Sequence, residues 1–85
     1  MKIYLISQNE NQRWDTYDSA VVYAPDEETA RNIDPGRGLK IKWDDDETHF
    51  SNYWCREPKN VKVEYLGEAN DEFGQGVICA SFHAG

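Results

Sequence analysis

The chain carries two histidines and two cysteines, which are the residue types that bind zinc most readily. They are His49, Cys55, Cys79 and His83. Structural zinc sites usually take their ligands in pairs two to five residues apart, but the first pair here is six residues apart. The second pair falls in an expected strand, where four residues span roughly 13 Å. A small zinc-binding domain is therefore kept as an alternative, and we predict no metal site and no cofactor.

A run of four carboxylates, Asp44 to Glu47, could attract a hard cation. Calcium loops place their oxygen ligands at alternating positions around a glycine turn. This run is consecutive and contains no glycine, so a solvated loop explains it better than a calcium site.

Catalysis by a cysteine nucleophile would need a histidine base beside it. Cys55 could pair with His49 or His83, but no local pattern supports either pair. The sequence has no Gly-x-Ser-x-Gly elbow, no phosphate-binding glycine loop and no helix expected to begin at a cysteine. We therefore predict that the protein is not an enzyme.

Aromatic residues gather in two expected loops. Trp14 and Tyr17 lie in the first, at residues 9–18, and Trp43, Phe50, Tyr53 and Trp54 lie in or beside the second, at residues 44–60. Tryptophan and tyrosine are common anchors of protein interfaces. In a small domain they also close the core beneath long loops. We expect most of them to be core residues, with Trp14 the first candidate for an exposed anchor.

The elements that would position these residues form an α+β domain. The apolar pattern predicts a small antiparallel sheet of four or five strands, in the order β-β-α-(β)-β-β, with one helix packed on a face. The first strand should be central, and the last is apolar enough to lie inside the sheet. A hairpin is expected to join the last two strands through residues 67–76. The expected strands are residues 2–8, 19–24, 38–43 (the optional one), 61–66 and 77–82.

The helix has the clearest local signals. Asp26 fits its N-cap, and Glu27 and Glu28 fall in its first turn, where carboxylates complement the helix dipole. Ala30 and Ile33 should form its buried stripe. The segment Asp34-Pro35-Gly36 should end it, because the residue before a proline is disfavoured in the helical region.

Composition restricts the class of protein. With 85 residues, the chain fits a single domain, residues 1–85. The net charge is −7, and residues 44–72 hold nine acidic side chains against three basic ones. This balance disfavours direct binding to nucleic acid or anionic lipid. Two cysteines, no signal peptide and no long apolar run together predict a cytoplasmic protein without a membrane span.

Several segments resemble small uncharacterised proteins encoded in bacteriophages, prophages and bacterial genomes. The resemblance covers most of the chain and is weakest over residues 37–57. It implies a small accessory protein of a mobile element, of the sort that binds and modulates a host protein. It implies no activity and no functional residue. The segments that carry it are Tyr17–Val22 (YDSAVV), Pro25–Arg31 (PDEETAR), Val61–Gly67 (VKVEYLG) and Ala80–Gly85 (ASFHAG).

The leading hypothesis is therefore a non-enzymatic, acidic protein-interaction module that binds a partner with a basic surface. An alternative is a homo-oligomeric assembly component, such as a homodimer formed through an edge strand. The expected contact residues are Trp14, Tyr17, Asp44, Asp45, Asp46 and Glu47.

Overall fold

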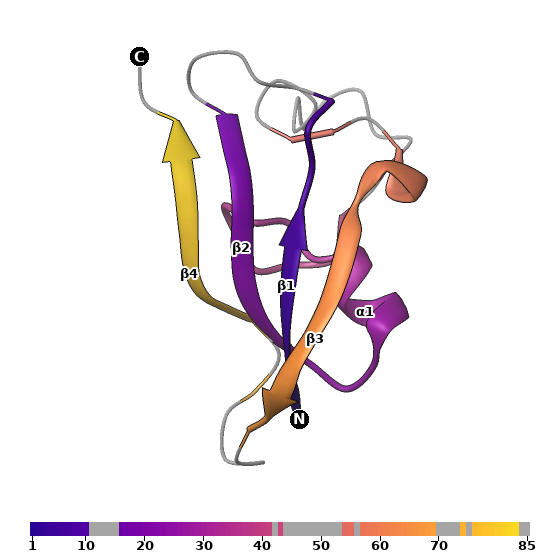
Figure 1. Cartoon of the computed structure of the whole chain (residues 1–85), viewed down its shortest axis with the longest axis vertical. Helices are drawn as coiled ribbons and strands as arrows, with labels where there is room; N and C mark the ends of the chain where they lie inside the picture. The colour runs from indigo at the N-terminus through magenta and orange to yellow at the C-terminus, as the bar shows by residue number, and fades with distance from the viewer. Residues whose placement is uncertain are drawn as a thin grey trace.

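A computed structural model describes residues 1–10, 16–41, 43, 54–55, 57–69, 74 and 76–83. The fold is a four-stranded antiparallel sheet with one short helix packed against it, which confirms the predicted α+β class (Figure 1). The strands lie in the order β3-β1-β2-β4. Their bounds are Lys2–Ser7 for β1, Thr16–Ala24 for β2, Lys62–Glu68 for β3 and Gly76–His83 for β4.

The first strand is central, as its two apolar faces predicted. β1 pairs with β2 on one side and with β3 on the other, both antiparallel. Tyr4 and Ile6 point into the core, while Ile3 and Leu5 lie on the opposite face and are half-buried. The link from β1 to β2 is the predicted antiparallel hairpin connection, although β2 begins at Thr16, three residues before the expected start.

Two predictions about the last strand were wrong. β4 pairs with β2 and lies at an edge of the sheet, not inside it. β3 is the opposite edge, so residues 67–76 do not connect a hairpin. Local apolar patterning led to both errors, because it indicates how apolar a strand is but not which strands pair with it.

The helix α1, Glu27–Arg31, begins as predicted but ends before the expected Asp34-Pro35-Gly36 segment, with Asn32 as its C-cap, so Ile33 lies just beyond it. Asp26 is its N-cap and accepts a hydrogen bond from the backbone N–H of Thr29. Ala30 and Ile33 are fully buried against the sheet. The predicted strand over 38–43 does not join the sheet within its described residues; Lys40 instead forms an isolated bridge with Ile33.

A tight loop explains that difference. The carboxylate of Asp34 accepts hydrogen bonds from the backbone N–H groups of Gly36 and Arg37. Its backbone accepts from Gly38 and donates to Leu39. Gly38 has a φ of 74°, a conformation that a residue without a Cβ adopts freely. The chain therefore turns back on α1 before it can extend along a strand.

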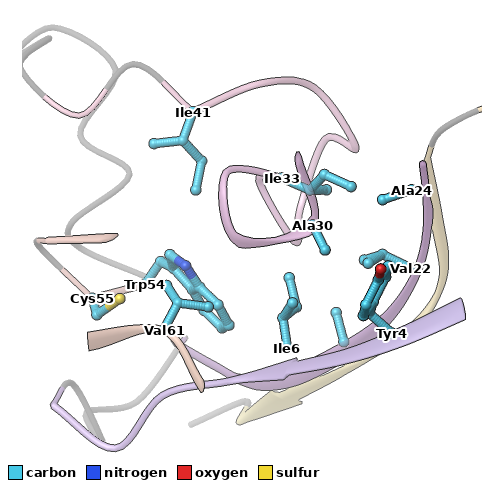
Figure 2. Close-up of a cluster of buried hydrophobic side chains, with 11 residues drawn as sticks. Tyr4, Ile6, Val22, Ala24, Ala30, Ile33, Ile41, Trp54, Cys55 and Val61 are labelled. Carbon is cyan, nitrogen blue, oxygen red and sulfur yellow. The ribbon is translucent and has the colours of Figure 1, made fainter. Parts of the chain in front are cut away.

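The core lies between one face of the sheet and the segment that contains α1 (Figure 2). Trp54 and Cys55 come from the expected second loop and are fully buried in this core. Val61 is almost fully buried as well. Trp43 packs partly against the same cluster, so the prediction that most loop aromatics are core holds for these two tryptophans. The other core side chains are Tyr4, Ile6, Ala20, Val22, Ala24, Ala30, Ile33 and Ile41.

The second loop also holds a short element that periodicity did not reveal. A 3-10 helix, η2, spans Pro58–Asn60 and begins with a proline at its first turn. Its single turn is too short to show a helical period. None of the helices formed by the described residues has the length and apolar character required to cross a lipid bilayer.

Candidate functional site

The structure separates the two cysteines that were considered as metal ligands. Cys55 lies in the core beside Val61, on the covered face of the sheet (Figure 2). Cys79 lies on β4 and pairs in register with Val21, a residue of the opposite face. His49 falls outside the described residues, and His83 is the last residue of β4. Within the described ranges, no three His, Cys, Asp or Glu residues come together as a metal site would require.

Cys55 has the environment of a structural cysteine. Its thiol donates to the backbone carbonyl of Glu57 across 3.5 Å. Burial, with a smaller contribution from the charge of Glu10, raises the pKa of the Cys55 thiol to about 12. A thiol needs its thiolate form to act as a nucleophile. The packing around Cys55 therefore opposes the cysteine chemistry considered from the sequence.

Of the predicted contact residues, only Tyr17 lies within the described part of the chain; Trp14 and Asp44 to Glu47 fall outside it. Tyr17 is half-buried and packs against the core. A Cβ added at Gly36 would lie 3.3 Å from the Tyr17 ring and its hydroxyl, so the ring rests on the Asp34 loop. Its backbone carbonyl also accepts a hydrogen bond from Gln8. Tyr17 thus supports the fold, and its outer part remains accessible.

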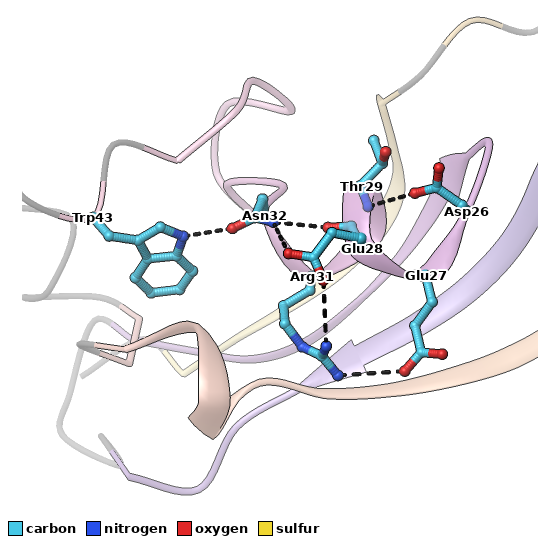
Figure 3. A network of polar contacts seen from close by, with 7 residues as sticks. All are labelled: Asp26, Glu27, Glu28, Thr29, Arg31, Asn32 and Trp43. Carbon is cyan, nitrogen blue, oxygen red and sulfur yellow. Dashed lines mark hydrogen bonds and ion pairs between the residues drawn. The ribbon is translucent and has the colours of Figure 1, made fainter.

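A polar network surrounds α1 (Figure 3). Arg31 forms ion pairs of 3.3 Å with Glu27 and 3.7 Å with Glu28, one turn earlier on the helix. Asn32 accepts a hydrogen bond of 2.6 Å from the indole N–H of Trp43 and donates to the backbone carbonyl of Glu28. These contacts tie the end of α1 to the second loop. The network is a structural feature that also leaves Glu27 and Glu28 exposed.

A shallow hollow of about 330 Å³ opens beside this network. It is lined by Glu28, Thr29, Asn32 and Lys40. Ligand pockets are usually lined by apolar and aromatic side chains around a few polar groups. This lining is polar throughout, and Asn32 is already bonded to Trp43 and Glu28. The described side chains that line the hollow include none of the apolar or aromatic types that usually line a small-molecule site.

β3 carries aromatic, aliphatic and acidic side chains that are exposed to solvent. Tyr65 is 54% exposed and Leu66 is 50% exposed. Tyr65 was expected to face inward, and it does lie on the same side of the sheet as Tyr4. The two rings meet edge to face, with their centroids 5.8 Å apart. Tyr65 nevertheless lies at the rim of the core and is more than half exposed. Its hydroxyl donates to the carboxylate of Glu68 across 2.9 Å. That bond to Glu68 is the main reason why the pKa of Tyr65 is raised.

The beginning of α1 and the last residues of β3 lie at the same end of the sheet. Lys2 is paired in register with Ala24 just before the helix and with Glu68 on β3, and its charge acts on Asp26. Glu27 points toward β3 in Figure 3. We call these residues the β3–α1 surface. It comprises Asp26, Glu27, Glu28, Tyr65 and Glu68, with Lys2 and Arg31 among them.

Sequence reasoning missed the β3–α1 surface because strict alternation in residues 61–66 placed Tyr65 in the core. Alternation assigns a side chain to a face, but burial also depends on whether the strand has neighbours on both sides. The exposure of Tyr65 follows from the position of β3 at an edge. A signal was present in the charges of Lys62, Glu64 and Glu68, which are typical of an edge strand.

The N-cap predicts a pH dependence of stability. The hydrogen bond from Thr29 lowers the pKa of Asp26, so its carboxylate stabilises the folded state at neutral pH. That contribution is lost as pH falls through the lowered pKa. We expect Asp26→Ala to lower the melting temperature at pH 7 and to differ less from the parent below about pH 4.

Thermal melts followed by circular dichroism at each pH measure the difference in melting temperature between the parent and the variant. Asp26→Asn is the control, since asparagine caps helices without a titrating charge. The melting temperature of Asp26→Asn should stay above that of Asp26→Ala at every pH. A gap between the parent and Asp26→Ala that is unchanged down to pH 2 would contradict the role of the carboxylate.

No family model, curated protein or solved structure matches this chain.

Proposed function

We propose that this chain is a non-enzymatic protein-interaction domain that binds a basic surface of a protein partner. The observation that supports it is the exposure of Tyr65 beside carboxylates on the β3–α1 surface. An exposed aromatic residue beside carboxylates suits a protein contact, because aromatic residues are favoured as interface anchors.

The charges of the surface favour a basic partner. The surface holds four carboxylates and two cations. The carboxylates are those of Asp26, Glu27, Glu28 and Glu68, and the cations are Lys2 and Arg31. Arg31 is already paired within α1. The net charge of the whole chain is −7. A lysine- or arginine-bearing partner would be attracted over a distance and would find carboxylates at the contact.

The aromatic group is held in place before binding. Tyr65 contacts Tyr4 edge to face, and Glu68 accepts the hydrogen bond of its hydroxyl. A side chain with a fixed rotamer loses less conformational entropy when a partner covers it. The resemblance to phage- and bacteria-encoded accessory proteins agrees with such a role, in which the domain occludes a surface of a host protein.

The experiment begins with affinity capture from a bacterial lysate on the immobilised protein, followed by elution with salt. The captured protein is then purified, and its affinity is measured by calorimetry against variants. We expect Tyr65→Ala and Glu68→Lys each to weaken binding by roughly tenfold or more, which corresponds to about 1.4 kcal/mol. The affinity should also fall as ionic strength rises.

The matched control is Glu57→Lys, which makes the same change of charge at an exposed site near η2. It should change the affinity little. Reversal of Asp44 to Glu47 and Trp14→Ala test the contacts expected from the sequence in the same assay. Equal losses in Glu68→Lys and Glu57→Lys would contradict the β3–α1 surface, and the absence of any enriched protein would contradict the interaction role.

A further inference from the structure

The second unusual surface is the edge formed by β4. Residues 73–85 contain no Lys, Arg, Asp or Glu, and β4 reads Gly-Val-Ile-Cys-Ala-Ser-Phe-His. That composition is typical of a strand inside a sheet, yet β4 is hydrogen-bonded to β2 alone among the described strands. Natural edge strands are usually protected by charges, and the other edge, β3, carries Lys62, Glu64 and Glu68. The two edges of this sheet therefore differ in kind.

Consecutive side chains in the middle of β4 are exposed where they would be covered in a central strand. Ile78 is 43% exposed, and Cys79, Ala80 and Ser81 are also exposed. An edge strand of this kind presents unpaired backbone groups to any strand that can approach it. Small side chains such as Ala80 and Ser81 do not obstruct that approach.

We propose that β4 pairs antiparallel with β4 of a second copy, so that two four-stranded sheets continue as one. The occupant follows from charge. Two chains of net charge −7 repel each other over most of their surfaces. β4 carries no Asp or Glu, and on its neighbour β2 the one carboxylate is Asp18, between the residues that pair with Ser81 and Phe82. Within β4 itself, a basic partner would find no carboxylate to pair with, and an identical strand would meet no like charge.

The register of β4 suggests where the two copies meet. Its pairing with β2 is regular over Cys79–Ser81 and shifts on either side of that segment, between Val21 and Val22 and between Tyr17 and Ser19. A two-fold axis near this segment would give each copy the same set of new backbone hydrogen bonds. It would also bring Cys79 of one copy close to Cys79 of the other.

Sedimentation velocity over a concentration series tests the proposal on the full chain. The parent should move from the mass of one chain to that of two. Ile78→Lys should weaken dimerisation by roughly tenfold or more, because it places like charges near each other across the two-fold axis. Leu66→Lys is the matched control, since it makes the same change at an exposed site on the opposite edge.

The sign of the result is informative. Both substitutions reduce the net negative charge, so a dimer governed by overall repulsion would strengthen in both variants. Melting curves verify that both variants fold. A short bismaleimide linker should also join two parent chains through Cys79 and should not join Cys79→Ser chains. A parent that stays monomeric throughout, an equal response of the two lysine variants, or a dimer that Cys79 cannot cross-link would each overturn the proposal.

Discussion

Trp54→Ala is expected to lower the free energy of unfolding by about 3–5 kcal/mol, as large-to-small changes of buried aromatic residues do. Trp54 is the largest of the fully buried side chains and belongs to the same core cluster as Ile6 and Val61. A small domain has a total stability of only about 5–15 kcal/mol. This single change should therefore remove much of the margin, and urea denaturation followed by circular dichroism measures it.

Tyr65→Ala is the matched control, because it removes an aromatic ring that is more than half exposed. Its loss should stay near the worth of one aromatic pair, about 0.5–1.5 kcal/mol. If Trp54→Ala fails to fold, Trp54→Phe retains part of the volume and should show an intermediate loss. Equal losses in Trp54→Ala and Tyr65→Ala would contradict the placement of Trp54 in the core.

The two cysteines should differ strongly in their reactivity toward a thiol reagent. With a pKa of about 12, the Cys55 thiol is ionised in about one molecule in 10⁴ at pH 8, and burial adds a steric barrier. Cys79 is exposed on the edge strand. We expect one fast-reacting thiol per native chain and a second that reacts at least about 100-fold more slowly.

Absorbance after addition of an aromatic disulfide reagent follows both phases. Denaturant should make the two thiols react at similar rates, and Cys79→Ser should remove the fast phase while leaving the slow one. A native chain with two fast thiols would show that Cys55 is open to solvent. A slow phase lost in Cys79→Ser would show that the two assignments are reversed.

Local signals in the sequence were sufficient for the individual elements. Alternation over residues 2–8 assigned Tyr4 and Ile6 to one face and Ile3 and Leu5 to the other. The Asp26 cap and the buried Ala30 follow from interactions within one or two turns of chain. Such features depend on neighbours close in sequence, so a single sequence contains them.

Strand order depended on information that local patterns lack. β1 has partners from residues 16–24 and 62–68, and β4 pairs with β2 across more than 50 residues of chain. Nothing in the apolar run of Val77 to Ala80 shows whether it has one neighbour or two. The same gap hid the candidate site, because the exposure of Tyr65 can be expected only when β3 is known to be an edge.

The central place of β1 also determines when the chain can fold during synthesis. β1 is made first, but one of its two neighbours, β3, ends at Glu68, more than 60 residues later. At roughly 5–20 residues per second, the ribosome needs several seconds to cover that distance. During this interval β1 exposes one apolar side and one unpaired backbone edge. A nascent chain of this protein would therefore depend on the β1–β2 hairpin, or on chaperones, to keep β1 from aggregating before β3 arrives.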